Sequence, residues 1–204
     1  MKRILKIGMD VHTTNYTLCA MEPVIGEEDR IFATIKVTPD YKNILMFIEN
    51  LKMKLGLEHD YDIQCGYEAG CLGYSLYNQL TAAGIKCVIL APTTMLTQQG
   101  VRIKTDVRDA HMIAQCLSYG GYHAVYIPTE DDDSVKEYLR MRNNHKMALK
   151  KIKQQINAFC IRHGYQYTGT KWTQTHIKWI KKLDIKNELY RETLTEYIVS
   201  YEEQ

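Results

Sequence analysis

Three short runs rich in β-branched and apolar residues open the chain, and polar or turn-like stretches separate them. They cover residues 3–9 (RILKIGM), 14–21 (TNYTLCAM) and 30–37 (RIFATIKV). Runs of this kind are typical of β-strands, and their close succession predicts a meander. From Tyr41 to Leu55 the apolar side chains recur at helical spacing, after a start signal at 38–40 and before Gly56, which predicts a helix.

Strand and helix patterns then alternate up to residue 127. A strand pattern covers 61–68 (YDIQCGYE), a helix pattern 72–84 and a second strand pattern 85–91. A further helix is expected to begin within KTDVRDA, residues 104–110, and to end at Gly120. The resulting order, β-β-β-α-β-α-β-α, predicts an α/β domain over residues 1–127 with a mixed sheet and flanking helices.

A different pattern follows Pro128, where the acidic stretch TEDDD leads into about thirty residues without proline or internal glycine before Gly164. Their apolar positions form a helical stripe, which predicts a long, basic, amphipathic helix that resembles a coiled coil. Five apolar side chains of this helix are expected to be buried, either against a second copy of the helix or against the rest of the chain if the helix folds back on it. They are Met147, Leu149, Ile152, Ile156 and Phe159. Two shorter helices at 172–183 and 187–201 complete a second, helical region over 128–204.

Composition supports a globular protein, since 45% of the 204 residues are hydrophobic and 25% are charged. We find neither a signal peptide nor a run of about 18 apolar residues, so we expect no membrane partner and a cytoplasmic location. The six cysteines are scattered without a C-x-x-C pair. That distribution favours a reducing compartment and argues against structural zinc.

The net charge of +2 hides a strong asymmetry along the chain. Residues 136–182 hold 12 basic side chains and one acidic side chain, whereas residues 1–135 carry a net charge of −5 and residues 183–204 one of −4. A segment this basic is expected to meet a polyanion such as DNA or RNA. The residues expected to bind it are Lys146, Lys150, Lys151 and Lys153.

Four carboxylates occupy places where α/β sheets expose chemistry. Asp10 stands at the end of the first strand, Glu68 at the end of the fourth, and Asp106 and Asp109 at the start of the last helix of the domain. If the two strands are neighbours, the carboxylates meet, and their repulsion is tolerable only with cations between them. Mg²⁺ or Mn²⁺ suits such oxygen ligands, and two ions would assist an in-line phosphoryl displacement. The simpler alternative is that Asp106 and Asp109 only complement the helix dipole, with Thr105 or Asp106 as the cap.

Three motifs, IGMDVH (7–12), GYEAG (66–70) and KTDVRDA (104–110), resemble those of the DEDD transposases of bacterial insertion sequences, whose first domain is similar to the RuvC resolvase. The resemblance implies a ribonuclease-H-like fold and DNA recombination, with Asp10, Glu68, Asp106 and Asp109 as catalytic metal ligands. It also implies a bacterial source, a guide RNA as partner, and a second transposase domain with a nucleophilic serine. We find no match to that domain or serine here, so the chain is expected to be incomplete as a recombinase.

Several alternatives remain open. One is a nuclease that acts on Holliday junctions, and another is a catalytically silent nucleic-acid-binding module. A sugar-kinase or actin-like ATPase is less favoured, because His12 stands where a phosphate loop needs glycine. Oligomers through the helical region are expected, but neither their number of copies nor the target and guide sequences can be deduced.

Individual polar and aromatic residues near these motifs have two interpretations each. Arg102, Lys104 and Arg108 either bind phosphates or neutralise the acids beside them. For His12 and His111 packing is favoured over substrate contact. Among the aromatic residues after Gly164, burial as one helical stripe is favoured over base stacking for Trp172 and Trp179, which are seven positions apart.

Overall fold

The computed structural model describes residues 3–24, 28–56, 61–70, 72–95 and 105–204. These residues divide into two compact units, Met1–Ile127 and Pro128–Gln204. Arg102 and Lys104, named above as candidate phosphate contacts, lie outside the described residues.

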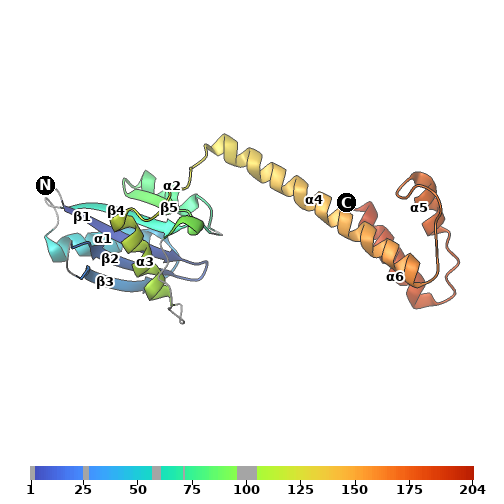
Figure 1. Ribbon diagram of the computed structural model, residues 1–204, viewed down its shortest axis with the longest axis horizontal. Coiled ribbons are helices and arrows are strands. Elements are labelled where there is room, and N and C mark those ends of the chain that lie inside the picture. The colour runs from blue at the N-terminus through green and yellow to red at the C-terminus, as the bar shows by residue number, and fades with distance from the viewer. Residues whose placement is uncertain (1–2, 25–27, 57–60, 71, 96–104) are drawn as a thin grey trace. The chain divides into compact units, whose positions relative to one another are not determined.

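The first unit contains a five-stranded mixed sheet (Figure 1). Strands β1 (Arg3–Val11), β2 (Tyr16–Glu22) and β3 (Arg30–Val37) form an antiparallel meander. Strands β4 (Tyr61–Glu68) and β5 (Lys86–Leu90) add to the other side of β1 in parallel, which gives the order β3-β2-β1-β4-β5. The predicted mixed sheet with flanking helices is therefore confirmed, and β1 and β4 are neighbours as the carboxylate argument requires.

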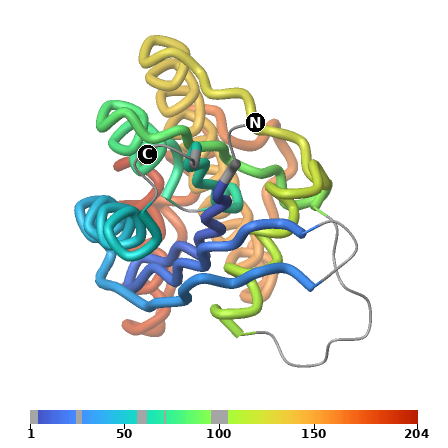
Figure 2. Tube along the Cα trace, turned by 90° about the vertical axis from the view of Figure 1, so that its left-hand side faces the viewer, coloured from blue at the N-terminus to red at the C-terminus, as the bar shows by residue number. Residues whose placement is uncertain are grey.

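The two faces of the sheet pack against different helices. Alternation along β1 directs Leu5, Ile7 and Met9 to the larger core, where α1 (Tyr41–Leu55) and α2 (Ser75–Ala82) cover them. The intervening side, which holds Gly8 and Asp10, faces α3 (Asp106–Tyr119). In Figure 2 the strands of the meander lie side by side in blue, and α3 appears in yellow-green. A short 3₁₀ helix, η1 (Pro92–Thr94), follows β5 and was not predicted.

Helix α3 lies unusually close to the sheet because Gly8 has no side chain. A Cβ atom added there would collide with the backbone of α3, at the carbonyl oxygen of Ala110 and the amide nitrogen of Ala114, and would lie 2.9 Å from the Ala114 Cα. Ala110 and Ala114 are themselves small and fully buried. This contact determines how near the first turn of α3 comes to the end of β1.

Several predicted boundaries need correction. Strand β2 begins at Tyr16 rather than residue 14, because His12 donates its backbone N–H to the Asn15 carbonyl (2.9 Å) in the hairpin turn. Helix α2 begins at Ser75 rather than residue 72, because Gly73 adopts a φ of 55°, which a helix cannot include.

The long helix α4 (Glu130–Arg162) also begins earlier than predicted, within the acidic stretch TEDDD instead of after it. Thr129 caps it by accepting from the amide of Asp132 (3.2 Å), and the acidic residues that follow complement the positive end of the helix. No described helix is both long and apolar enough to cross a membrane.

The second unit packs only the end of α4. Ile156, Phe159 and Cys160 form a small core with α5 (Gln174–Lys181) and α6 (Glu188–Glu202). The prediction of burial is confirmed within the unit for Ile156 and Phe159. Met147 is 56% exposed in the single chain, so its burial against a second copy stays a prediction. Leu149 and Ile152 are half-buried.

Trp172 and Trp179 do not form one helical stripe. Helix α5 begins at Gln174, so Trp172 lies before it, in the left-handed region at φ 67°. Both indoles are half-buried and pack against the ring of His176, which accepts a hydrogen bond at Nδ1 from the Trp172 backbone N–H (2.9 Å). The two tryptophans therefore support the turn into α5.

Candidate functional site

Asp10 and Glu68 lie at the carboxyl ends of two adjacent parallel strands, Asp10 next to the last residue of β1 and Glu68 as the last residue of β4. The last paired residues of β1 and β4 are Met9 and Tyr67, so each carboxylate follows its strand's last pair by one position. Met9 and Tyr67 lie in the core under α1 and α2, and alternation therefore places Asp10 and Glu68 on the opposite face, toward α3. Adjacent strands are about 4.8 Å apart, which makes these two residues direct neighbours.

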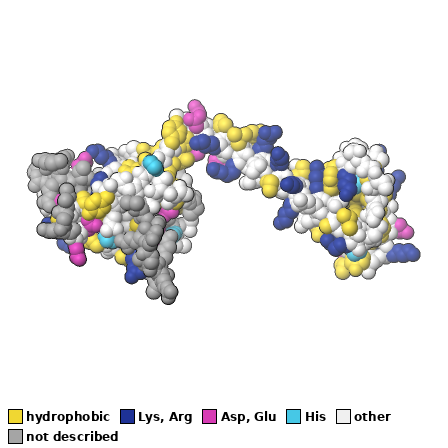
Figure 3. Space-filling view, in the orientation of Figure 1, with side chains coloured by type: hydrophobic (Ala, Val, Ile, Leu, Met, Phe, Trp, Pro, Cys, Tyr) yellow, Lys and Arg dark blue, Asp and Glu magenta, His cyan; other side chains and the backbone are white. Residues whose placement is uncertain are grey.

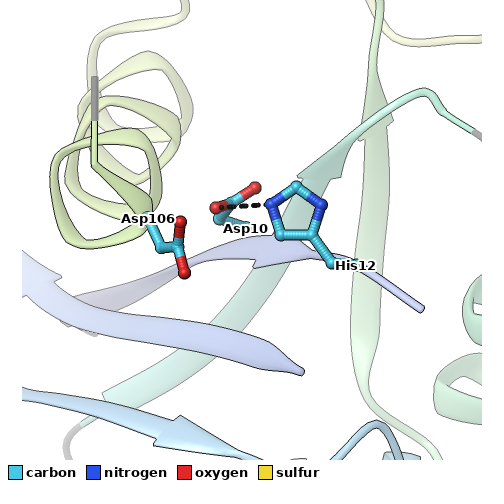
Figure 4. Close-up of side chains that lie close together, drawn as sticks. All are labelled: Asp10, His12 and Asp106. Atoms are coloured by element: carbon cyan, nitrogen blue, oxygen red, sulfur yellow. Dashed lines mark hydrogen bonds and ion pairs between the residues drawn. The ribbon is translucent and has the colours of Figure 1, made fainter. Parts of the chain in front are cut away.

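The first turn of α3 supplies the other two carboxylates. Thr105 caps the helix with its hydroxyl, which accepts from the Arg108 amide (3.4 Å), so Asp106 and Asp109 both lie in the first turn. One oxygen of Asp106, one of Asp10 and one ring nitrogen of His12 lie within 4.8 Å of one another (Figure 4). Glu68 and Asp109 are not members of this compact group of three.

The charges in this group act on one another. Burial raises the pKa of the Asp10 carboxyl, and the negative charges of Asp109 and Asp106 raise it further, while His12 opposes both effects. His12 Nε2 lies 3.2 Å from Asp10 Oδ2. By contrast, the hydrogen bond from Lys36 Nζ to Asp106 Oδ2 (2.8 Å) lowers the pKa of Asp106. Asp109 is thus within electrostatic reach of Asp10, although it lies outside the compact group.

The donor set fits a hard divalent cation. Carboxylate oxygens are preferred ligands of Mg²⁺ and Mn²⁺, and the imidazole nitrogen of His12 is tolerated by Mn²⁺ more readily than by Mg²⁺. Asp10 is only partly exposed, whereas His12 and Asp106 are open enough for an ion or a substrate to reach them, with side-chain exposures of 53% and 40%. Asp10, Asp106 and His12 are therefore the described residues best placed to hold such an ion.

Sequence reasoning favoured packing for His12 and did not identify Lys36. His12 is exposed and directed at Asp10, so a packing role does not describe it. Its position two residues after Asp10 could have indicated this contact, because the last residues of a strand and the turn that follows them lie at the same edge of the sheet. Lys36 gives no local signal, since only the pairing of β3 with β2 brings it to this face. His111 is half-buried, and its Nε2 has no partner among the described residues.

Basic side chains line the exposed part of α4. Lys146, Lys150 and Lys151 are exposed, and Figure 3 shows Lys and Arg side chains in dark blue along this helix. Lys153 differs from them, because its ammonium lies 5.4 Å from the ring centroid of Trp172 and 5.7 Å from that of Tyr201. Arg108 is exposed at the start of α3.

This strand order, with Asp10 and Asp106 brought together where β1 and α3 meet, places the first unit in the class of ribonuclease-H-like α/β proteins. Residues 7–160 match the family model of the IS110-type DEDD transposases, described as "Transposase", and the chain therefore belongs to that family.

Two curated relatives are transposases. The chain is 32% identical over 201 residues to the transposase for insertion sequence element IS1533 of Leptospira borgpetersenii, a match that covers 97% of this chain and 56% of the relative. It is 29% identical over 193 residues to the putative transposase y4qE of Sinorhizobium fredii, covering 94% and 48%. The chain thus spans about half the length of the curated relatives it matches.

Two solved structures of RuvC from Thermus thermophilus are also similar to the chain. RuvC alone is 12% identical, with a TM-score of 0.39, over 59% of this chain and 99% of RuvC. RuvC in complex with a Holliday junction substrate is 11% identical, with a TM-score of 0.36, over 60% and 99%.

Proposed function

We propose that this chain is the metal-binding and nucleic-acid-binding part of a DNA transposase that acts on phosphodiesters. One observation carries the proposal: in a member of a transposase family, Asp10 and Asp106 meet at the end of β1 and the start of α3, with His12 beside them. Lys36 and His12 offset part of this negative charge in the protein alone, and a divalent cation bound between the carboxylates would offset it more fully.

Each carboxylate has a part in this proposal. Asp10 and Asp106 hold Mg²⁺ or Mn²⁺ directly, and Glu68 and Asp109 complete the ligand set from the next strand and the same helical turn. When bound, the metal supplies Lewis-acid activation and orientation of the oxygens in phosphoryl transfer. The half-buried setting of Asp10 keeps its carboxylate in one position and limits the water around it. His12 restricts the orientation of Asp10 through their contact.

The test measures Mn²⁺ binding, and the electron paramagnetic resonance signal of the free ion reports how much Mn²⁺ remains unbound. Asp10→Asn and Asp106→Asn are each expected to weaken binding at least about tenfold, because the loss of even an indirect contact costs that much. Asp62→Asn is the matched control, since Asp62 also pairs with a lysine, Lys86, but lies at the start of β4, at the opposite end of the strand from the site. Equal Mn²⁺ affinities in all four proteins would contradict the metal site.

We also propose that α4 binds nucleic acid, including a guide RNA, through its exposed lysines. Its positive charges are not interleaved with acidic ones over residues 136–182, apart from Glu137. Contacts from lysines to phosphates carry no base information, so this surface holds either polymer in register without reading its sequence. Sequence reading is then left to base pairing by the RNA.

Pairing of two copies through α4 is the third part of the proposal. Val135, Tyr138 and Leu139 share one face of the helix at spacings of three and four residues, and they are 57%, 62% and 52% exposed. We expect Leu139→Glu to shift the chain toward monomer in sedimentation equilibrium, because a carboxylate would have to be buried in the contact. Met53→Glu, at an apolar position on α1 that is even more exposed (73%), is expected to leave the association unchanged. An unchanged association of Leu139→Glu would exclude this face as the interface.

A further inference from the structure

Strand pairing places three polar residues in one row across the sheet beside the proposed metal site. Asp10 on β1 pairs with Thr17 on β2, and Thr17 pairs with Lys36 on β3. Directly opposite residues of antiparallel strands point to the same face. The row therefore extends the carboxylate site, on the α3 side of the sheet, by a hydroxyl and an ammonium group.

Thr17 is unusual among the polar residues of the unit. It is 1% exposed, and its hydroxyl has no hydrogen-bond partner within the described part of the chain. Buried polar atoms are nearly always paired, so an unpaired hydroxyl next to a functional site suggests that the partner is a ligand.

An open pocket of about 440 Å³ lies at this place. Thr17, Thr34 and Lys36 line it from the sheet, and Thr105 and Asp106 line it from the start of α3. The hydroxyls and the ammonium offer several donors within one small volume, whereas Asp106 is the single acidic group of the lining. Such a lining favours an anionic ligand with several acceptor oxygens.

In the protein alone, Lys36 forms an ion pair with Asp106, which is also a proposed metal ligand. Its Nζ lies 2.8 Å from Asp106 Oδ2, and its side chain is 59% exposed. A cation bound by Asp10 and Asp106 would take over the charge of that carboxylate and repel the ammonium. Lys36 would then be available to a second anion in the same pocket.

We propose that this pocket binds a phosphodiester of the DNA strand held at the metal site, with Lys36 and Thr17 as its donors. The inference rests on the proposed function and adds the residues that position the DNA backbone. Without metal, Lys36 pairs with Asp106; with metal, it exchanges that partner for a phosphate oxygen. The hydroxyl of Thr17 gains the acceptor that it lacks in the protein alone.

The experiment compares wild type, Lys36→Gln and Lys86→Gln in two titrations. Lys86 is the control because it is a similarly exposed strand lysine that also pairs with an aspartate, Asp62, but belongs to β5. Mn²⁺ alone is titrated first. A short DNA duplex is then titrated by fluorescence anisotropy at several salt concentrations, with and without Mn²⁺.

Lys36→Gln is expected to bind Mn²⁺ as tightly as wild type or up to about fivefold more tightly, because a competing cation has been removed from Asp106. With Mn²⁺ present, it is expected to bind DNA about fivefold more weakly, with a salt slope smaller by about 0.9, which corresponds to one lost phosphate contact. Without Mn²⁺, its DNA binding is expected to equal that of wild type. Lys86→Gln is expected to match wild type in each titration.

Thr17→Val provides a second variant of nearly equal shape. Removing an unpaired buried hydroxyl is expected to leave the unfolding midpoint unchanged or raised, since no hydrogen bond within the protein is lost. DNA binding with Mn²⁺ is expected to fall about threefold. A fall without Mn²⁺ as well would contradict an exchange that depends on the metal.

The outcomes distinguish this inference from the proposed function. If wild type binds no Mn²⁺, the proposed metal site fails. If wild type binds Mn²⁺ but Lys36→Gln binds DNA as wild type does, the metal site stands and the phosphate pocket is refuted. If Lys36→Gln loses Mn²⁺ and DNA binding together, Lys36 only supports Asp106, and the inference is likewise refuted.

Discussion

Replacing Gly8 with alanine is expected to lower the free energy of unfolding of the Met1–Ile127 unit by about 3 kcal/mol, the upper end of the usual cost of overpacking. The new methyl group would meet backbone atoms of α3, and backbone cannot turn aside as a flexible side chain can. The helix must therefore move away from β1. Because Asp106 begins α3 and Asp10 lies next to the last residue of β1, the same movement separates the two carboxylates.

The measurement is urea denaturation, monitored by tryptophan fluorescence and by circular dichroism. Both tryptophans, Trp172 and Trp179, lie in the second unit, so their fluorescence reports on that unit alone. Far-ultraviolet circular dichroism reports on both units. We expect the dichroism of Gly8→Ala to show an earlier transition while the tryptophan transition remains unchanged. Mn²⁺ affinity is expected to fall as well.

Gly70→Ala is the matched control for this prediction. The nearest atom to a Cβ at Gly70 is the Glu68 carbonyl oxygen at 3.9 Å, an ordinary contact, and its φ is not in the left-handed region. We expect its unfolding transition to match that of wild type. Equal stability of Gly8→Ala and Gly70→Ala would show that α3 does not depend on close contact with β1.

Replacing Lys146, Lys150 and Lys151 together with glutamine is expected to weaken binding to duplex DNA by roughly a hundredfold at physiological salt and to reduce the salt slope by about 2.7. Both figures follow from the loss of three phosphate contacts and the counterions that they release. The effect is expected to be the same for unrelated DNA sequences. Fluorescence anisotropy at several salt concentrations measures both quantities.

A control with the same change of charge lies on α1. Lys42, Lys52 and Lys54 are also three lysines of one helix, and their triple replacement alters the net charge equally. We expect it to change DNA affinity less than threefold. Similar losses in the two triple variants would mean that net charge, rather than the surface of α4, governs binding.

Lys153→Gln is expected to act mainly on stability, because that ammonium packs over Trp172 and Tyr201.

Local patterns were sufficient for several elements of the fold. Helix α1 and strands β3 and β4 have the bounds that the sequence predicts, because their signals are contained in the elements themselves. For α1 these signals are Asp40, whose side chain accepts from the Lys42 amide, and Gly56, which adopts the left-handed conformation.

Non-local pairing limited the prediction of the site. The place of Asp10 and Glu68 at strand ends could be deduced, since it depends only on where each strand stops. The row of Asp10, Thr17 and Lys36 could not, because a shift of one residue in register would turn Lys36 to the other face. Likewise, nothing near Gly8 in the sequence indicates that another helix's backbone fills the space beside it.

The apolar stripe of α4 illustrates a different limit. Periodicity indicates which side of a helix avoids water, but it does not indicate what covers that side. Ile156 and Phe159 are covered by α5 and α6, whereas Leu139 and Met147 remain exposed in the chain by itself.

The length of α4 also determines how strongly its acidic first turn affects the electrostatic potential around its lysines. Asp132 and Lys150 are 18 positions apart, which at about 1.5 Å per residue corresponds to roughly 27 Å along the helix. Ions at physiological concentration screen exposed charges beyond about 8 Å. The four acidic residues of the first turn therefore cannot cancel the potential around the distant lysines, and an approaching polyanion meets that potential at nearly full strength despite the small net charge of the whole chain.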